Sequence, residues 1–114
     1  MDMMELRNLE QLRIFVGEQV KLAHRPLYEA IVHEALAEGL AGATVQKGVL
    51  SYGHHQIVHT AKIIEYSVNL PMVIELVDSE SKIEAFFPVL ERMVKESGDR
   101  VMVTRERVRS GIIE

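Results

Sequence analysis

Three histidines lie close together in the middle of the chain. His54, His55 and His59 form the pattern HHxxxH, and imidazole nitrogen is a common ligand of zinc and copper. The surrounding segment has no cysteine and no acidic residue to complete the coordination, and this spacing alone is a weak signal of a metal site. A divalent-metal site is therefore an alternative to the simpler interpretation, in which polar histidines occupy an exposed loop.

The same segment offers little for catalysis. A histidine that acts as a general base needs a nucleophile or an acid within hydrogen-bond reach. Ser51, Tyr52 and Thr60 are near the histidines in sequence, but nearness in sequence does not establish geometry. The chain also has no cysteine, which removes thiolate nucleophiles. We therefore expect a protein that is not an enzyme, with no catalytic residues and no resident cofactor.

Arginines repeat near the carboxyl terminus with the period of a β-strand. Val101, Val103, Arg105, Arg107 and Arg109 share one parity, so a strand that continues this far would carry guanidinium groups along one face. Guanidinium groups bind phosphates and carboxylates through paired hydrogen bonds. The pattern predicts an anion site or, as an alternative, a charged edge strand that prevents aggregation.

Two acidic residues interrupt apolar strand segments. Glu65 and Glu75 both have apolar neighbours in the sequence. Either could be a buried carboxylate at a functional site. Exposure to solvent, or an ion pair between subunits, is the commoner explanation for an acid in such a position.

The elements that must position these residues follow from the periodicity of apolar side chains. Strands are predicted at 12–16, 43–50 and 101–108, and the segments 61–66 and 72–77, on either side of a break at 69–71, count together as one bent strand. Helices are predicted over 27–38 and from an N-cap at Asp78 or Ser79 to about residue 97. The order βαββαβ, with one apolar stripe on each helix, predicts an α+β, ferredoxin-like fold, in which two helices cover one face of an antiparallel sheet. We expect a polar leader at 1–10 and a single domain at 11–114.

Length and composition limit the class of protein. A chain of 114 residues with 47% hydrophobic residues is long enough to bury one core. Its net charge of -4 argues against non-specific binding to nucleic acid, which requires a basic surface. No apolar run approaches the roughly 20 residues that span a bilayer, and the first residues do not resemble a signal peptide. We expect a cytoplasmic protein that does not insert into membranes.

Several segments in a fixed order carry a resemblance to a known family. They are LRIFVGE at 12–18, RPLYEAIV at 25–32, GLAGATV at 39–45, HTAKI at 59–63, LPMVIELVD at 70–78 and IEAFFPVLERMV at 83–94. With these segments the chain resembles the uncharacterised PII-like family, also known as the UPF0166 family, over nearly all of its length after the leader. It is more distantly similar to the nitrogen regulatory PII signalling proteins.

The resemblance implies a function. PII proteins are trimers of ferredoxin-like subunits that bind adenine nucleotides in clefts between neighbours and contact transporters, channels or enzymes through a long T-loop. By similarity, we expect a homotrimeric regulatory protein that binds AMP, ADP, ATP or a cyclic nucleotide. Its regulated partner would be a protein such as a membrane transporter or channel, and residues 51–59 would take the place of the T-loop.

Individual residues carry over from the PII pattern. Gly42 and Thr44 fall where PII proteins line the adenine pocket, and Gly53 falls at the base of the loop. Arg107 and Arg109 fall where PII proteins supply arginines to the phosphates held by a neighbouring subunit. The loop residues that would contact a partner protein are Ser51, Tyr52, His54, His55 and His59.

Two departures from PII change what the resemblance implies. The Gly- and Lys-rich phosphate loop of PII corresponds here to KESGDRV at 95–101, where Gly98 and Arg100 are partial substitutes. We therefore expect a monophosphate or cyclic nucleotide to bind better than a triphosphate. The 51–59 loop is also much shorter than a T-loop, and Tyr52 stands at its start, so modification of a loop tyrosine is not carried over.

Two alternatives stay open besides the nucleotide sensor. One is a trimer that binds a divalent metal through His54, His55 and His59. The other is a scaffold whose loop binds a partner protein without any small ligand.

Overall fold

The computed structural model describes residues 5–48, 50–51, 59–60 and 70–114. The strands are β1 (Arg7–Gly17), β2 (Lys21–Leu22), β3 (Arg25–Pro26), β4 (Ala43–Lys47), β5 (Leu50–Ser51), β6 (His59–Thr60), β7 (Pro71–Asp78) and β8 (Met102–Ser110), and the helices are α1 (Leu27–Ala37) and α2 (Glu80–Ser97). The strand predicted at 61–66 lies outside the described residues.

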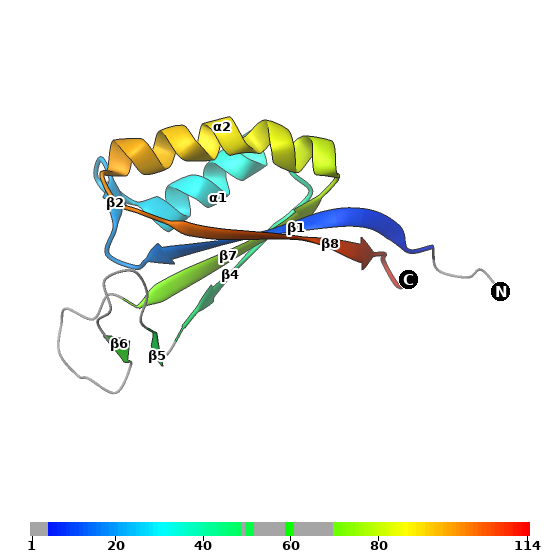
Figure 1. The fold of residues 1–114 in the computed structure, drawn as a ribbon, viewed down its shortest axis with the longest axis horizontal. Coiled ribbons are helices and arrows are strands. Elements are labelled where there is room, and N and C mark those ends of the chain that lie inside the picture. Colours follow the sequence, from blue (N-terminus) through cyan, green and yellow to red (C-terminus); the bar gives the residue numbers. More distant parts are fainter. Residues whose placement is uncertain (1–4, 49, 52–58, 61–69) are drawn as a thin grey trace.

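The four long strands form one sheet with β1 in its interior. The strand order is β4-β7-β1-β8, and each neighbouring pair is antiparallel. Both helices cover the same face of this sheet (Figure 1), and no helix of the described chain covers the other, which we call the open face. The predicted α+β, ferredoxin-like arrangement is confirmed.

The core lies between the helices and the sheet. Burial alternates from residue to residue along β1. Leu12, Ile14 and Val16 are buried under the helices, whereas the residues between them are only partly covered. The helices supply the matching apolar stripes predicted from their periodicity, with Leu27, Ile31 and Ala35 on α1 and Ile83, Phe86, Leu90 and Met93 on α2. Burial of each large apolar side chain stabilises the fold by roughly 1.5–3 kcal/mol.

The ends of α2 are set by local chemistry. The Ser79 hydroxyl accepts a hydrogen bond from the backbone N–H of Lys82 at 3.3 Å, as expected of an N-cap residue. At the other end, Gly98 adopts a left-handed backbone with φ of 78°, a conformation that glycine adopts without the steric penalty of a side chain. Helix α2 therefore begins and ends where its sequence predicts.

Three boundaries differ from the sequence-based expectation. Strand β1 begins at Arg7, so residues 7–10, assigned to a polar leader, are strand. Strand β8 continues to Ser110, two residues beyond the predicted end. The strand predicted at 43–50 ends at Lys47, and Leu50–Ser51 instead pairs with His59–Thr60 in a separate two-stranded ribbon. In each case backbone pairing extends or divides the strand where side-chain pattern alone gives no signal.

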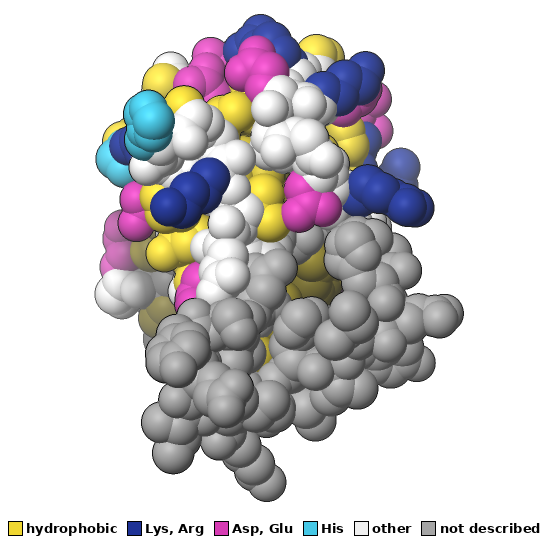
Figure 2. Space-filling view, turned by 90° about the vertical axis from the view of Figure 1, so that its left-hand side faces the viewer, with side chains coloured by type: hydrophobic (Ala, Val, Ile, Leu, Met, Phe, Trp, Pro, Cys, Tyr) yellow, Lys and Arg dark blue, Asp and Glu magenta, His cyan; other side chains and the backbone are white. Residues whose placement is uncertain are grey.

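Charges of both signs mix at the end of the molecule that carries the β2–β3 hairpin. Figure 2 views this end and shows Lys and Arg side chains interspersed with Asp and Glu. One ion pair in this part of the fold joins Lys47 Nζ to Glu18 Oε2 at 2.6 Å. The described surface seen in this view is therefore not a basic face of the kind that binds nucleic acid.

Candidate ligand-binding site

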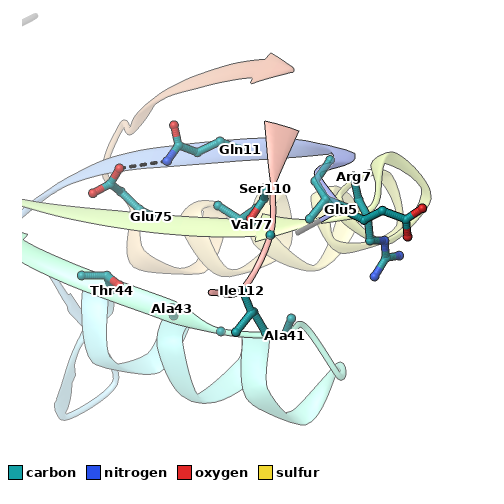
Figure 3. A pocket seen from close by; sticks show the side chains of 13 residues that line it. Glu5, Arg7, Gln11, Ala41, Ala43, Thr44, Glu75, Val77, Ser110 and Ile112 are labelled. Carbon is teal, nitrogen blue, oxygen red and sulfur yellow. Dashed lines mark hydrogen bonds between the residues drawn. The ribbon is translucent and has the colours of Figure 1, made fainter. Parts of the chain in front are cut away.

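A cavity of about 670 Å³ lies against the open face of the sheet, within the range of about 300–1,000 Å³ typical of small-molecule sites. It is lined by Glu5, Arg7, Leu9, Gln11, Ala41, Gly42, Ala43, Thr44, Glu75, Val77, Ser110, Gly111 and Ile112. Figure 3 shows the residues of β1, β4 and β7 together with the carboxyl-terminal segment. The cavity thus combines an apolar surface with a few polar groups, as ligand sites commonly do.

One wall of the cavity is the turn between α1 and β4, and two polar contacts hold it. Asp78 Oδ2, at the end of β7, accepts a hydrogen bond from the Ala41 backbone N–H at 2.9 Å. Lys82 Nζ donates to the Gly39 carbonyl at 3.0 Å. Gly39 itself has φ of 82°, a left-handed conformation that favours glycine. The turn that carries Gly42 is therefore fixed by side chains of β7 and α2.

A polar network crosses the floor of the cavity. Thr44 on β4 and Glu75 on β7 are directly opposed in the sheet. Glu75 Oε2 accepts hydrogen bonds from Gln11 Nε2 and from Arg13 Nε, both at 3.1 Å. Arg13 NH1 also donates to Glu106 Oε1 at 2.9 Å. The bond to Glu75, with that to Glu106, raises the pKa of Arg13, so the guanidinium stays charged.

A second pocket, of about 360 Å³, lies on the helix-covered side of the sheet near the start of α2. Its lining includes Arg107, Arg109, Asn8 and Glu80. Arg107 is opposite Glu10 in the β1–β8 register, and Glu10 shares its parity with the buried core residues of β1. No hydrogen bond or ion pair joins the side chain of Arg107 or of Arg109 to another described residue, so both guanidinium groups are available to an anion.

Arg105 is in a different situation, although it shares the parity of these two arginines. Its Nε and NH2 atoms donate to the two carboxylate oxygens of Glu10 at 2.7 and 2.6 Å, and NH1 donates to Glu84 at 2.6 Å. The guanidinium also lies 4.9 Å from the centre of the Phe87 ring, a cation–π distance. These bonds, led by that to Glu10, raise the pKa of Arg105. Its role is therefore to join β8, β1 and α2.

The predicted site residues divide between several parts of the fold. Gly42 and Thr44 line the large cavity, whereas Arg107 and Arg109 line the pocket on the opposite side of the same sheet. Arg100 precedes β8, at the end of that strand away from Arg109. Within one chain the structure therefore brings the predicted adenine-pocket residues together but separates them from the predicted phosphate-binding arginines.

The loop residues are described only at its base. Ser51 and His59 are paired in the β5–β6 ribbon, and Tyr52, Gly53, His54 and His55 lie outside the described residues. In Figure 1 the ribbon lies at the end of the sheet away from the carboxyl terminus. Within the described parts of the chain, no group of three or more metal-binding side chains comes together.

Sequence reasoning did not identify Arg7, Gln11 or Arg13 as cavity or network residues. The alternation of burial along β1 could have identified them. Every second residue from Leu12 is buried, and the residues between face the open side. This alternation is hidden in the sequence because Phe15, on the open side, is apolar too. With apolar residues on both parities, the 12–16 segment has the pattern typical of a strand covered on both faces. Glu75, which stands among apolar neighbours in the sequence, forms an ion pair within its own chain.

The sequence matches the model of one protein family over most of its length. The model of DUF190, described as "Uncharacterized ACR, COG1993", matches residues 9–110. The chain belongs to the DUF190 family. Members similar to it include a UPF0166 protein of Methanocaldococcus jannaschii, 37% identical over 87 residues, which are 76% of this chain and 80% of that protein. A UPF0166 protein of Aquifex aeolicus is 35% identical over 75 residues, 66% of this chain and 71% of that one.

Solved structures similar to this DUF190 protein have the PII-like fold. A putative PII-like signalling protein from Thermus thermophilus aligns with a TM-score of 0.65 and 17% identity, over 94% of this chain and 92% of that one. CPII from Thiomonas intermedia K12, a nitrogen regulatory PII-like protein bound to ADP, AMP and bicarbonate, aligns with a TM-score of 0.62 and 18% identity, over 95% and 92% of the two chains. The expected membership of the PII-like UPF0166 family is confirmed.

The described part of this DUF190 protein contains no helix long and apolar enough to cross a membrane.

Proposed function

We propose that this DUF190 protein is a PII-like sensor that binds an adenine nucleotide in clefts between the subunits of a homotrimer. The observation that carries the proposal is the cavity on the open face, because it contains Gly42 and Thr44, the two residues expected in the adenine pocket. The adenine nucleotides of CPII, a protein of the same fold, support the choice of ligand.

The separation of the two pockets is the reason to propose clefts between subunits. Arg107 and Arg109 line the helix side of the sheet, so they cannot reach a ligand on the open face of their own chain. In an assembly, a neighbouring chain would supply them to the phosphates. The open face also carries partly covered apolar residues such as Phe15, Val73 and Val108, and contact with another copy would remove them from water.

Among the described residues that line the large cavity, Arg7 is the one that carries a positive charge. Arg7 is exposed and lies two alternate positions before Gln11 on β1, a separation of about 14 Å along the strand. The cavity therefore has a polar floor at Glu75 and Thr44 and a guanidinium group towards its other end, near Glu5. This polarity fits a ligand with a base at one end and an anionic group at the other.

The proposed output is a contact between the 51–59 loop and a protein partner such as a transporter or channel. The paired strands β5 and β6 fix both ends of this loop, so Ser51 and His59 are held side by side while the intervening residues provide the contact surface. Nucleotide binding would be signalled through this segment. Tyr52, His54 and His55 are the side chains proposed to meet the partner.

Titration calorimetry and thermal unfolding with AMP, ADP, ATP and cyclic AMP test the proposal. A ligand at about 100 times its dissociation constant adds roughly 2.7 kcal/mol to the free energy of unfolding, so at least one nucleotide should raise the midpoint clearly. Native mass spectrometry of the same samples should give three chains per particle. An unchanged midpoint with every nucleotide would rule out the nucleotide sensor.

A double variant, R107A with R109A, tests the contribution of a neighbouring chain. Neither arginine has a partner among the described residues, so the fold should keep its stability while nucleotide affinity falls. Full affinity in this variant would show that the phosphates are held elsewhere. Under the scaffold alternative, the same variant would bind its partner normally and no nucleotide would bind the unmodified protein.

A further inference from the structure

The pocket of about 360 Å³ beside the start of α2 contains charged groups of both signs. Its lining includes Arg107 and Arg109 on β8 and the acid Glu80, the first residue of α2. No hydrogen bond or ion pair joins any of these three side chains to another described residue. The pocket therefore offers two guanidinium groups and one carboxylate to a ligand.

The sheet register explains why the two arginines are left without partners. Arg107 is directly opposite Glu10, and Arg109 is opposite Asn8, in the pairing of β1 with β8. Both carboxylate oxygens of Glu10 already accept hydrogen bonds from Arg105, so Arg107 has an acidic neighbour that is already paired. The two free arginines stand at alternate positions on one face, about 7 Å apart along the strand. Their long side chains can therefore hold one carboxylate together.

The mixture of charges selects the chemical class of the ligand. An anion without a positive group would be attracted by the two arginines but repelled by Glu80, and a simple cation would meet the reverse situation. A molecule that carries a carboxylate and an ammonium group close together satisfies both signs. The pocket volume of about 360 Å³ lies at the lower end of the range for small-molecule sites, which suits a small metabolite.

We propose that this pocket binds a free α-amino acid. Arg107 and Arg109 hold its carboxylate, and Glu80 accepts hydrogen bonds from its ammonium group. Asn8, which also lines the pocket, has an amide group that donates and accepts hydrogen bonds and so favours a ligand with a polar side chain. The site lies within a single chain and does not include the cavity on the open face, so the inference goes beyond the proposed function.

An amino acid in this pocket would compete with the nucleotide of a neighbouring subunit, a consequence that rests on the proposed function. Arg107 and Arg109 are the residues proposed to reach the phosphates of that nucleotide. Guanidinium groups that hold a carboxylate are not available to a phosphate. Saturation with the amino acid should therefore weaken nucleotide binding, and the nucleotide should weaken amino acid binding by the same factor.

Thermal unfolding with each common L-amino acid, in the absence of nucleotide, tests the site. At least one should raise the midpoint, because a ligand that binds only the folded state stabilises it. Calorimetry then compares that amino acid with its analogue in which hydrogen replaces the α-amino group. The amino acid should bind about fivefold more tightly, the upper part of what an exposed ion pair contributes. An unchanged midpoint with every amino acid, or equal affinity of the two compounds, would overturn the inference.

Glu80→Gln separates recognition of the ammonium group from a structural role in the first turn of α2. This change should weaken the amino acid about fivefold and leave the affinity of the deaminated analogue unchanged. A structural role alone would lower both affinities together, which contradicts the inference. Glu91→Gln is the matched control, because it removes an exposed acid from the same helix outside the pocket lining, and should leave both affinities unchanged.

Nucleotide titrations of the same samples keep the two proposals apart. A protein that binds a nucleotide but no amino acid would retain the proposed function and lose only this inference. A protein that binds an amino acid but no nucleotide would show the opposite.

Discussion

Arg105 and Glu10 form a two-bond ion pair between β8 and β1, with Nε to Oε1 at 2.7 Å and NH2 to Oε2 at 2.6 Å. The Glu10 side chain is only 12% exposed, so this carboxylate depends on its partner for compensation. Removal of the partner of a largely buried carboxylate leaves an unpaired charge, which is more destabilising than loss of a pair in which both members are exposed.

Arg105→Met should therefore lower the free energy of unfolding by about 1–3 kcal/mol, since it leaves Glu10 without its guanidinium partner. Urea denaturation followed by circular dichroism measures the change. Arg107→Met is the matched control on the same face of β8, and should shift stability by less than about 0.5 kcal/mol. Equal effects of the two changes would show that the Glu10 pair contributes nothing specific.

Gly48→Ala should destabilise the junction after β4. A Cβ atom at this position would lie 2.7 Å from Pro71 Cγ, and the Gly48 N–H donates to the Pro71 carbonyl at 2.8 Å, so neither side can withdraw without a change in the pairing. A clash of this kind costs about 1–3 kcal/mol, measurable as a lower thermal midpoint.

Gly42→Ala is the contrasting change and tests the cavity wall. A Cβ atom there would have no heavy atom within 4 Å, so the stability of the ligand-free protein should be unaffected. Gly42 lines the cavity, so an added methyl group should reduce the space for the proposed ligand and lower nucleotide affinity in calorimetry. An unchanged affinity would exclude Gly42 from the binding surface.

Asp78→Ala should loosen the turn that forms one wall of the cavity. The Asp78 carboxylate accepts from the backbone N–H groups of Ala41 and Ser79, and its loss leaves the α1–β4 turn without its bond to β7. We expect about 1–2 kcal/mol of destabilisation, together with faster amide hydrogen exchange at Ala41. Asp78→Asn keeps one acceptor oxygen and should show a smaller effect; identical behaviour of the two variants would contradict this account.

Arg7→Gln should weaken binding of AMP by about fivefold, the upper part of what an exposed ion pair contributes. Adenosine, which has no phosphate, should bind the variant and the unmodified protein equally. Arg92→Gln, on the exposed surface of α2, removes the same charge away from the cavity and should leave AMP affinity unchanged. A loss of adenosine affinity in Arg7→Gln would point to a contact with the base or sugar instead.

The sequence predicted the architecture well because periodicity and capping are local. The apolar stripes of α1 and α2 and the caps at Ser79 and Gly98 required only neighbouring residues to be recognised. Membership of the PII-like family could likewise be predicted from short sequence segments that occur in a fixed order along the chain. The start of β1 at Arg7 could not be read locally, because the polar residues there are stabilised by pairing with β8, about 100 residues away in the sequence.

The site was less predictable because its contacts depend on which residues of neighbouring strands lie opposite one another on each face of the sheet. Arg105, Arg107 and Arg109 share a parity, yet only Arg105 meets acidic partners among the described residues, on β1 and α2. The link between Gln11 and Glu75 joins residues 64 positions apart. Such contacts depend on sheet register, and the spacing of residues along one strand contains no information about it.

The alternation of β1 has a consequence for folding fidelity. Glu10 pairs with Arg105 on the helix side, and the next residue, Gln11, bonds to Glu75 on the open side. A slip of one residue would turn Gln11 and Arg13 under the helices and expose the apolar side chains between them. It would also break the ionic contacts on both faces at once. The charged groups of this strand therefore penalise misaligned sheets, and select one pairing among those that an apolar pattern alone would tolerate.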